Sequence, residues 1–157
     1  MGYTHYWKFK KNPKDCKNGS KKFAKSVELL KKCLAKVPAE IEGETYDWEN
    51  FTKKPVKIPF VLKGGNGEGE PKFTDELVCF NGDASIDCDH ETCYFALDND
   101  RYAFDFCKTA RKPYDVAVCL ALLCFKKNFG DDFSYSSDGN KDDEGWKMAH
   151  NIFNEIV

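Results

Sequence analysis

The segment that decides the fold is Phe106-Cys107-Lys108-Thr109-Ala110-Arg111-Lys112-Pro113-Tyr114-Asp115, which leads directly into Val116-Ala117-Val118-Cys119-Leu120-Ala121-Leu122-Leu123. Proline is favoured in the first turn of a helix, because its missing N–H would have no helical partner there. Phe129-Gly130 ends the apolar pattern, and glycine is common just beyond a helix. The sequence therefore predicts a helix from Pro113 to about Asn128.

Three cations, Lys108, Arg111 and Lys112, lie within five positions just before this helix. A helix start carries unpaired N–H groups and a partial positive charge, so further cations are unfavourable there unless an anion binds. Only two of the 24 basic residues are arginines, Arg101 and Arg111. Because arginine offers a planar fork for carboxylate or phosphate, this count favours Arg111 as an anion-binding residue.

Two interpretations of this cation cluster remain open from the sequence. In the functional one, Tyr114 offers a ring on which a nucleotide base stacks, together with Tyr102 or Phe104 on a neighbouring strand. In the simpler one, the cations form surface ion pairs worth about 0–1 kcal/mol each. Their partners would be nearby acids, namely Asp105, Asp115 and those in residues 131–144.

Length and composition predict one globular domain over residues 1–157. The net charge is −2 and the isoelectric point is about 5.9, so no overall basic field attracts DNA or RNA, and we expect no nucleic-acid partner. No apolar run approaches the length of about 20 residues needed to cross a membrane. We therefore expect no membrane partner.

Eight cysteines are present, and we expect most of them to be reduced. The first seven residues lack the apolar core of a secretory signal and lead into a lysine-rich segment. Several cysteines also fall in apolar stretches, where a free thiol behaves as a small hydrophobic side chain. These features predict a cytoplasmic localisation.

The remaining patterns predict an α+β fold, with an antiparallel sheet of about four to five strands packed with three helices. Alternation at the N-terminus places Tyr3, His5, Trp7 and Phe9 on one face of a strand. Spacings of three and four predict helices over about 20–37 and 143–157, whereas residues 40–59 follow no regular pattern. The other predicted strands are Leu77–Phe80, Tyr94–Leu97, Tyr102–Cys107 and Phe133–Ser136, with Asp98-Asn99-Asp100 joining two of them as a hairpin.

The first strand is a second candidate ligand surface. Tyr3, His5 and Trp7 can line a pocket, and His5 can act as a hydrogen-bond donor or as a general acid or base near neutral pH. The simpler interpretation is a core strand in which a backbone carbonyl binds His5. Both interpretations remain open from the sequence.

Two further motifs have the residue types of metal sites. Asp138, in Ser137-Asp138-Gly139, can contact a ligand or an oxygen-preferring cation, although the segment lacks the spacing of a calcium loop and a turn is the simpler interpretation. Cys88, His90 and Cys93 can bind zinc only with a fourth ligand from elsewhere, and the alternatives are a Cys88–Cys93 disulfide or an exposed loop with inert thiols. We predict no metal and no cofactor.

The glycine-rich tract Gly65–Pro71 (GNGEGEP) lacks the Lys-Ser/Thr ending of a phosphate-binding loop, and its glutamates would repel phosphate. We interpret it as a mobile connection or lid.

Five motifs taken together resemble a family of small, uncharacterised bacteriophage and prophage proteins. They are Gly2–Trp7 (GYTHYW), Gly65–Pro71, Phe80-Asn81-Gly82, Phe106–Asp115 (FCKTARKPYD), and Ser137-Asp138-Gly139 with Trp146. The motifs span nearly the whole chain. The resemblance implies a phage or mobile-element origin, and hence the host cell cytoplasm, but implies no particular biochemical activity.

These patterns predict a binding protein that captures an anionic, nucleotide-derived small molecule without turnover. The predicted ligand-binding residues are Lys108, Arg111, Lys112, Tyr114, His5, Tyr3, Trp7 and Asp138. By analogy with phage counter-defence, such a protein would sequester a host immune signal. One alternative is a phosphodiesterase or nuclease that uses His5 as acid or base, with Lys108 and Arg111 stabilising phosphoryl charge and Asp138 or Asp115 as metal ligand or orienting residue. The other alternative is a protein–protein inhibitor. A homo-oligomer is compatible with the sequence.

Overall fold

A computed structural model describes residues 2–157. Its first sheet has the strand order β7-β1-β8, in which β1 (Thr4–Phe9) pairs antiparallel with β7 (Asp105–Lys108) and with β8 (Phe133–Ser137). The first strand of the chain is thus the central strand of this sheet. The predicted alternation is confirmed, because the buried side chains of this segment are Tyr3, His5, Trp7 and Phe9.

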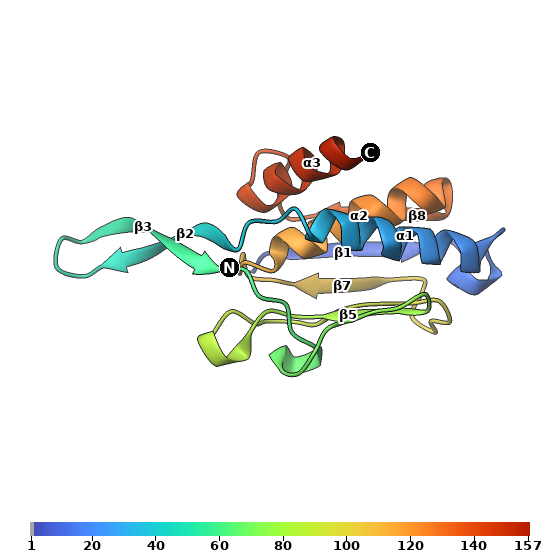
Figure 1. Ribbon diagram of the computed structural model, residues 1–157, viewed down its shortest axis with the longest axis horizontal. Coiled ribbons are helices and arrows are strands. Elements are labelled where there is room, and N and C mark those ends of the chain that lie inside the picture. Colours follow the sequence, from blue (N-terminus) through green and yellow to red (C-terminus); the bar gives the residue numbers. More distant parts are fainter. Residues whose placement is uncertain (1) are drawn as a thin grey trace.

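The helices of the described residues are Gly19–Leu34 (α1), Asp115–Phe129 (α2) and Glu144–Ile156 (α3), and α2 packs against β8 of this sheet. Twelve of the fifteen residues of α2 are buried, as expected of a helix that is apolar on all sides. Both other helices contact α2, and Figure 1 shows all three on the same side of β1 and β7. The three predicted helices are confirmed, although α1 ends three residues before its predicted end.

Aromatic side chains fill the space around α2. The Phe125 ring stacks on Phe95 with centroids 4.3 Å apart, and Phe95 in turn stacks on Trp7 at 4.9 Å. Phe9 and Phe133 lie against the same group. Much of the high aromatic content therefore belongs to the core.

A second sheet has the order β4-β5-β6, with β4 at Lys72–Phe73, β5 at Leu77–Phe80 and β6 at Cys93–Ala96. The predicted hairpin through residues 98–100 is wrong, because β6 and β7 belong to different sheets. The connection between them binds the turn after β1 instead. Asn12 Oδ1 accepts a hydrogen bond from the Asn99 N–H, and Asn12 Nδ2 donates to Asp98.

The third sheet is a hairpin of β2 (Glu40–Asp47) and β3 (Thr52–Pro59), in a region where the sequence predicts no regular structure. This hairpin, here called the arm, extends away from the rest of the molecule (Figure 1). The α+β class is therefore confirmed, but the single sheet of four to five strands is wrong. The strands form three separate sheets of two or three strands each.

The glycine-rich tract contains a short 3₁₀ turn at Gly65–Gly67, packed beside another at Ala84–Ile86. Gly67 has a φ of +78°, and a Cβ atom there would approach Ala84 and Asp89 to within 3 Å. A side chain is therefore excluded at this position. No helix within residues 2–157 is both long and apolar enough to cross a membrane.

Candidate functional site

A buried hydrogen-bonded pair, His5 and Asp115, joins β1 to the first turn of α2. His5 Nε2 lies 2.6 Å from Asp115 Oδ1, and both side chains are buried. The Thr109 hydroxyl donates to the same carboxylate oxygen at 2.6 Å. Gly145 in α3 lies so close that a Cβ atom there would overlap Asp115 Oδ2. Because an unpaired buried carboxylate is costly, these partners are needed for Asp115 to occupy this position.

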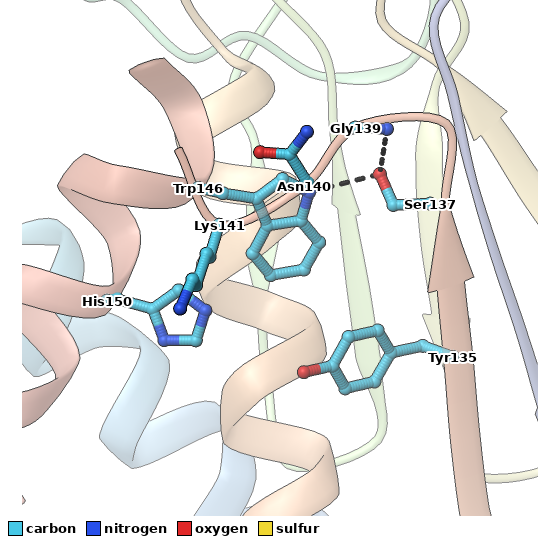
Figure 2. A pocket seen from close by; sticks show the side chains of 7 residues that line it. All are labelled: Tyr135, Ser137, Gly139, Asn140, Lys141, Trp146 and His150. Atoms are coloured by element: carbon cyan, nitrogen blue, oxygen red, sulfur yellow. Dashed lines mark hydrogen bonds between the residues drawn. The ribbon is translucent and has the colours of Figure 1, made fainter. Parts of the chain in front are cut away.

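Ser137 at the end of β8 binds the other ring nitrogen of His5, with Ser137 Oγ 2.8 Å from Nδ1. The backbone N–H of Gly139 and the indole Nε1–H of Trp146 both donate to Ser137 Oγ at 3.0 Å (Figure 2). Since N–H groups only donate, both acceptor positions of Oγ are occupied and the hydroxyl proton is directed to His5 Nδ1. Nε2 then carries the imidazole hydrogen and donates it to Asp115. The result is a continuous chain from Ser137 through His5 to Asp115.

Cys119 completes the buried cluster, with Sγ 3.8 Å from both His5 Nε2 and Asp115 Oδ2. Within residues 2–157, one group of three His, Cys, Asp or Glu residues places its ligand atoms within 4.8 Å of one another, and it consists of His5, Asp115 and Cys119. Burial, with the nearby Asp115 carboxylate, raises the pKa of the Cys119 thiol well above its usual value. Cys119 is therefore a neutral thiol here, whereas metals bind the thiolate.

The structure does not support the zinc site considered from the sequence. Cys93 is fully buried in β6, where Cys107 lies beside it. His90 is exposed, and the Cys88 thiol donates toward the Ile86 carbonyl. The strand directs Cys93 inward while the preceding loop leaves His90 outside, so the three ligands do not converge.

A hollow of about 220 Å³ opens at Ser137, and Figure 2 shows the side chains around it. Tyr135 of β8 stacks on Trp146 of α3 with ring centroids 5.6 Å apart. The His150 ring centroid lies 5.7 Å from that of Trp146. The lining residues are Tyr135, Ser137, Gly139, Asn140, Lys141, Trp146 and His150. Ser137 therefore belongs both to this hollow and to the buried chain that ends at Asp115.

Arg111 contacts the loop formed by residues 138–143 through Asp143. Its guanidinium carbon lies 4.0 Å from the centroid of the Tyr3 ring, and one N–H donates to Asp143 Oδ1 at 3.2 Å. Asp143 also accepts the Asn140 N–H at 2.7 Å. This backbone hydrogen bond, together with Arg111, lowers the pKa of Asp143. The Arg111 side chain is nevertheless 61% exposed.

The backbone beneath Arg111 has an unusual conformation. Ala110 and Arg111 have φ values of +52° and +60°, which for residues other than glycine cost about 1–2 kcal/mol each. The N–H groups of Thr109 and Ala110 both donate to the Tyr3 carbonyl, which holds this turn in place. Tyr3 also has a buried hydroxyl for which residues 2–157 offer no hydrogen-bond partner. Burial and the nearby Asp115 carboxylate raise the pKa of this phenol, which therefore stays neutral.

The other two cations of the predicted cluster are directed elsewhere. Lys112 Nζ donates to the Asp87 carbonyl at 2.7 Å, and the end of the Lys108 side chain lies beside Gly2. The predicted open helix start is wrong, because the N–H groups of residues 115, 116 and 117 donate to carbonyls three residues earlier. These hydrogen bonds use the backbone N–H groups that would otherwise bind an anion. The ion-pair interpretation is confirmed for Arg111, whose acid, Asp143, lies in the acidic segment 131–144 considered from the sequence.

Tyr114 and Trp7 are core residues, 1% and 3% exposed. The Tyr114 hydroxyl donates to the Glu91 carbonyl at 2.6 Å. The prediction that the Tyr114 ring stacks on a base is therefore wrong, since neither face of the ring reaches solvent. Asp138 accepts hydrogen bonds from the Thr4 N–H and the Tyr6 hydroxyl, so its carboxylate is bound to β1.

His5, Tyr3 and Arg111 are predicted from the sequence as ligand-binding residues, and the structure brings these three together. From the sequence, Asp115 is an ion-pair partner of surface cations or, in the enzyme alternative, a metal ligand or orienting residue, whereas Ser137 is only part of a turn. His5 binds the side chains of these two residues, not the backbone carbonyl considered from the sequence. Separations of 110 and 132 residues along the chain leave no local pattern that pairs them.

Three of the segments that carry the phage resemblance meet in this region, namely Gly2–Trp7, Phe106–Asp115 and Ser137–Gly139 with Trp146. Comparison with protein-family models, with curated proteins and with solved structures finds no match. The phage origin therefore stays a prediction, and the site must be interpreted from its own geometry.

Proposed function

We propose that the protein captures a small anionic, nucleotide-derived molecule, and that Arg111 binds its phosphate or carboxylate. The observation that carries this proposal is a guanidinium that is fixed in place yet largely exposed. Tyr3 supports one face of it, Asp143 holds one nitrogen, and two left-handed residues set its direction. Backbone strain of this kind tends to occur at functional sites, which supports a binding role.

Arg111 retains enough free donors for a ligand. A guanidinium has five N–H donors, and Asp143 accepts one of them. The remaining edge can bind two oxygens of a phosphate or carboxylate in the planar geometry that arginine favours. Because the side chain is already held in position, binding costs less side-chain entropy than it would for a free arginine.

The hollow at Ser137 offers contacts for the rest of such a ligand. It shares the loop of residues 138–143 with Arg111, and Lys141 and His150 add polar or positive groups at its edge. Tyr135 is half-buried and is the aromatic residue of this hollow with the larger exposed area. In this proposal it takes the base-stacking role that the sequence assigned to Tyr114. Sequestration of a host signalling nucleotide is the biological role that we propose for such binding.

Isothermal titration calorimetry with a panel of cyclic and ADP-ribose-type nucleotides tests the proposal. A charge-assisted hydrogen bond contributes about 1.5–3 kcal/mol, so Arg111→Ala should weaken binding about 10- to 100-fold. Arg101 is the matched control, because it is similarly exposed, at 70%, and also faces an aspartate, Asp105. Arg101→Ala should leave affinity unchanged. Absence of heat with every member of the panel would contradict the proposal.

The phosphodiesterase alternative receives less support. His5 is fully buried and both of its ring nitrogens are occupied, so it cannot contact a phosphate directly. The test is to incubate the protein with the same nucleotides, denature it, and analyse what is released. Altered nucleotide would favour the enzyme, and intact nucleotide would favour capture.

One observation favours the protein–protein inhibitor as a second candidate. The tip of the arm exposes two large aromatic side chains, Trp48 at 76% and Phe51 at 74%, and aromatic residues dominate the binding energy of many interfaces. Size-exclusion chromatography with host extract can compare the wild type with a W48S/F51S variant. Identical elution of both would argue against this function.

A further inference from the structure

We infer that the group bound at Arg111 is a terminal phosphate, and that it takes the place that the Asp143 carboxylate occupies in this structure. This assignment rests on the proposed function and adds to it the chemical group that the donors select. Three hydrogen-bond donors meet at the carboxylate, namely the Arg111 guanidinium, the Asn140 backbone N–H and the Tyr3 hydroxyl. The carboxylate accepts from the first two and leaves the third without a partner among residues 2–157.

The Asp143 carboxylate marks a position that an anion prefers. Its Oδ1 accepts an N–H of Arg111 at 3.2 Å, and its Oδ2 accepts the backbone N–H of Asn140 at 2.7 Å. The Asn140 hydrogen bond and the Arg111 guanidinium lower the pKa of Asp143, because both favour its charged form. Asp143 also directly precedes α3, and the start of a helix carries a partial positive charge. Several features of this position therefore stabilise negative charge.

The Tyr3 hydroxyl is the donor that the carboxylate does not use. Tyr3 is 4% exposed, and residues 2–157 offer its hydroxyl no hydrogen-bond partner. A Cβ atom at Gly139 would overlap this hydroxyl and lie 2.7 Å from Asp143 Oδ2, so the two groups are neighbours on one side of Gly139. Burial raises the pKa of the phenol, and the charge of Asp143 adds to this effect, so the hydroxyl keeps its proton and can donate it. A buried donor without a partner is costly, and an oxygen of a ligand would satisfy it.

A terminal phosphate matches these three donors better than a carboxylate does. A carboxylate has two oxygens, whereas a phosphate monoester has three terminal oxygens and a charge of about −1.5 to −2 at pH 7. One oxygen can accept from each donor, and arginine and phosphate form a strong charge-assisted pair. A cyclic phosphodiester has only two terminal oxygens and one negative charge. The site should therefore distinguish a phosphate monoester from a cyclic diester.

Asp143 can leave this position while Arg111 keeps its support. The Asp143 side chain is 24% exposed, and an ion pair at a surface contributes little to stability. The Tyr3 ring still lies beneath the guanidinium, 4.0 Å from its carbon atom. An incoming phosphate can bind the free edge of Arg111 first and then replace the carboxylate. Asp143 is therefore an internal competitor of the ligand.

Titration of the full chain with adenosine 5′-monophosphate and with its 3′,5′-cyclic form, followed by NMR spectroscopy, tests the inference. The two probes share base and sugar and differ in the number of terminal phosphate oxygens. We expect the 5′-monophosphate to bind about 10-fold more tightly and to shift the amide signal of Asn140. Tyr3→Phe removes the third donor, so it should weaken binding of the 5′-monophosphate about 10-fold and leave binding of the cyclic form unchanged.

Asp143→Asn tests the competition. Asparagine keeps an oxygen that can accept the Asn140 N–H but lacks the charge, so the 5′-monophosphate should bind about 3- to 10-fold more tightly. Asp142→Asn is the matched control, because it removes the same charge from the exposed residue next to Asp143. Since solvent and salt screen an exposed charge, this control should change the affinity by less than about 2-fold.

Thermal unfolding of Tyr3→Phe gives a second readout that needs no ligand. Loss of an unpartnered hydroxyl should leave the melting temperature unchanged or raise it. A lower melting temperature would show that the hydroxyl has a partner within the fold, and would overturn the inference.

The two probes also separate this inference from the proposed function. Equal affinity for both would overturn the terminal-phosphate assignment, whereas anion capture would stand if Arg111→Ala still weakened both. Absence of binding by the 5′-monophosphate at millimolar concentration would overturn the inference as well. The wider nucleotide panel would then decide the proposed function by itself.

Discussion

Two regions of the molecule each contain a mostly buried aspartate that accepts several hydrogen bonds. The two aspartates differ in how far along the chain their partners lie. Asp115 is 5% exposed and binds His5, 110 residues earlier. Asp47 is 8% exposed, and its partners are Glu49, Asn50 and Lys54, all within the tip of the arm. The first aspartate holds distant elements together, whereas the second orders only its own hairpin. We therefore expect substitution of Asp115 to destabilise the whole fold, and substitution of Asp47 to change the structure of the arm tip only.

Asp115→Ala should have the largest effect. It leaves the His5 Nε2–H and the Thr109 hydroxyl buried without their acceptor, and each unsatisfied buried polar group costs about 1–3 kcal/mol. Urea denaturation measures this loss in the free energy of unfolding. A loss below about 1 kcal/mol would show that the cluster does not hold the fold together.

Phe125→Ala and Phe51→Ala test the same contrast with an apolar side chain. Phe125 is fully buried among aromatic rings, and its removal should cost about 3–5 kcal/mol through lost contacts and a cavity. Phe51 is 74% exposed on the arm, so its replacement should change stability by no more than about 0.5 kcal/mol. Comparable melting temperatures for the two variants would contradict the comparison.

Gly139→Ala should have an intermediate effect. A Cβ atom at this position would overlap the Tyr3 hydroxyl and lie 2.7 Å from Asp143 Oδ2. Overpacking of this kind costs about 1–3 kcal/mol, and here it would also displace the support of Arg111. Gly65→Ala is the control, since the nearest atom to its new Cβ is 3.9 Å away. Thermal unfolding should separate the two variants.

The smallest expected effect is a loss of order at the arm tip in acid. Hydrogen bonds from Asn50 and the ion pair with Lys54 lower the pKa of Asp47. Its contribution to stability is therefore present above the unfolded pKa of about 3.9 and is lost as the pH falls through the lower folded value. Amide signals of Glu49 and Asn50 in NMR spectra should shift in this range. Asp47→Asn should remove the shift, and persistence of the shift would assign it to another group.

Local patterns predict the helices and most strands because each depends on the spacing of its own residues. The apolar run from Val116 predicts α2 to within two residues at either end, and the alternation of Tyr3 to Phe9 predicts β1. The arm is missed because both of its faces are largely exposed, which removes the alternation that marks a strand. The sheet partners of β1 and the hydrogen bonds of His5 depend on residues more than 90 positions away, which one sequence does not pair.

The central place of β1 in its sheet also bears on how the protein is made. Both strands that flank it, β7 and β8, lie more than 90 residues later in the chain. During synthesis, the backbone of β1 stays unpaired and Trp7 stays exposed until β7 and β8 have been synthesised. Such late, non-local pairing slows folding and prolongs the exposure of apolar surface. The nascent chain is therefore an expected client of ribosome-bound chaperones.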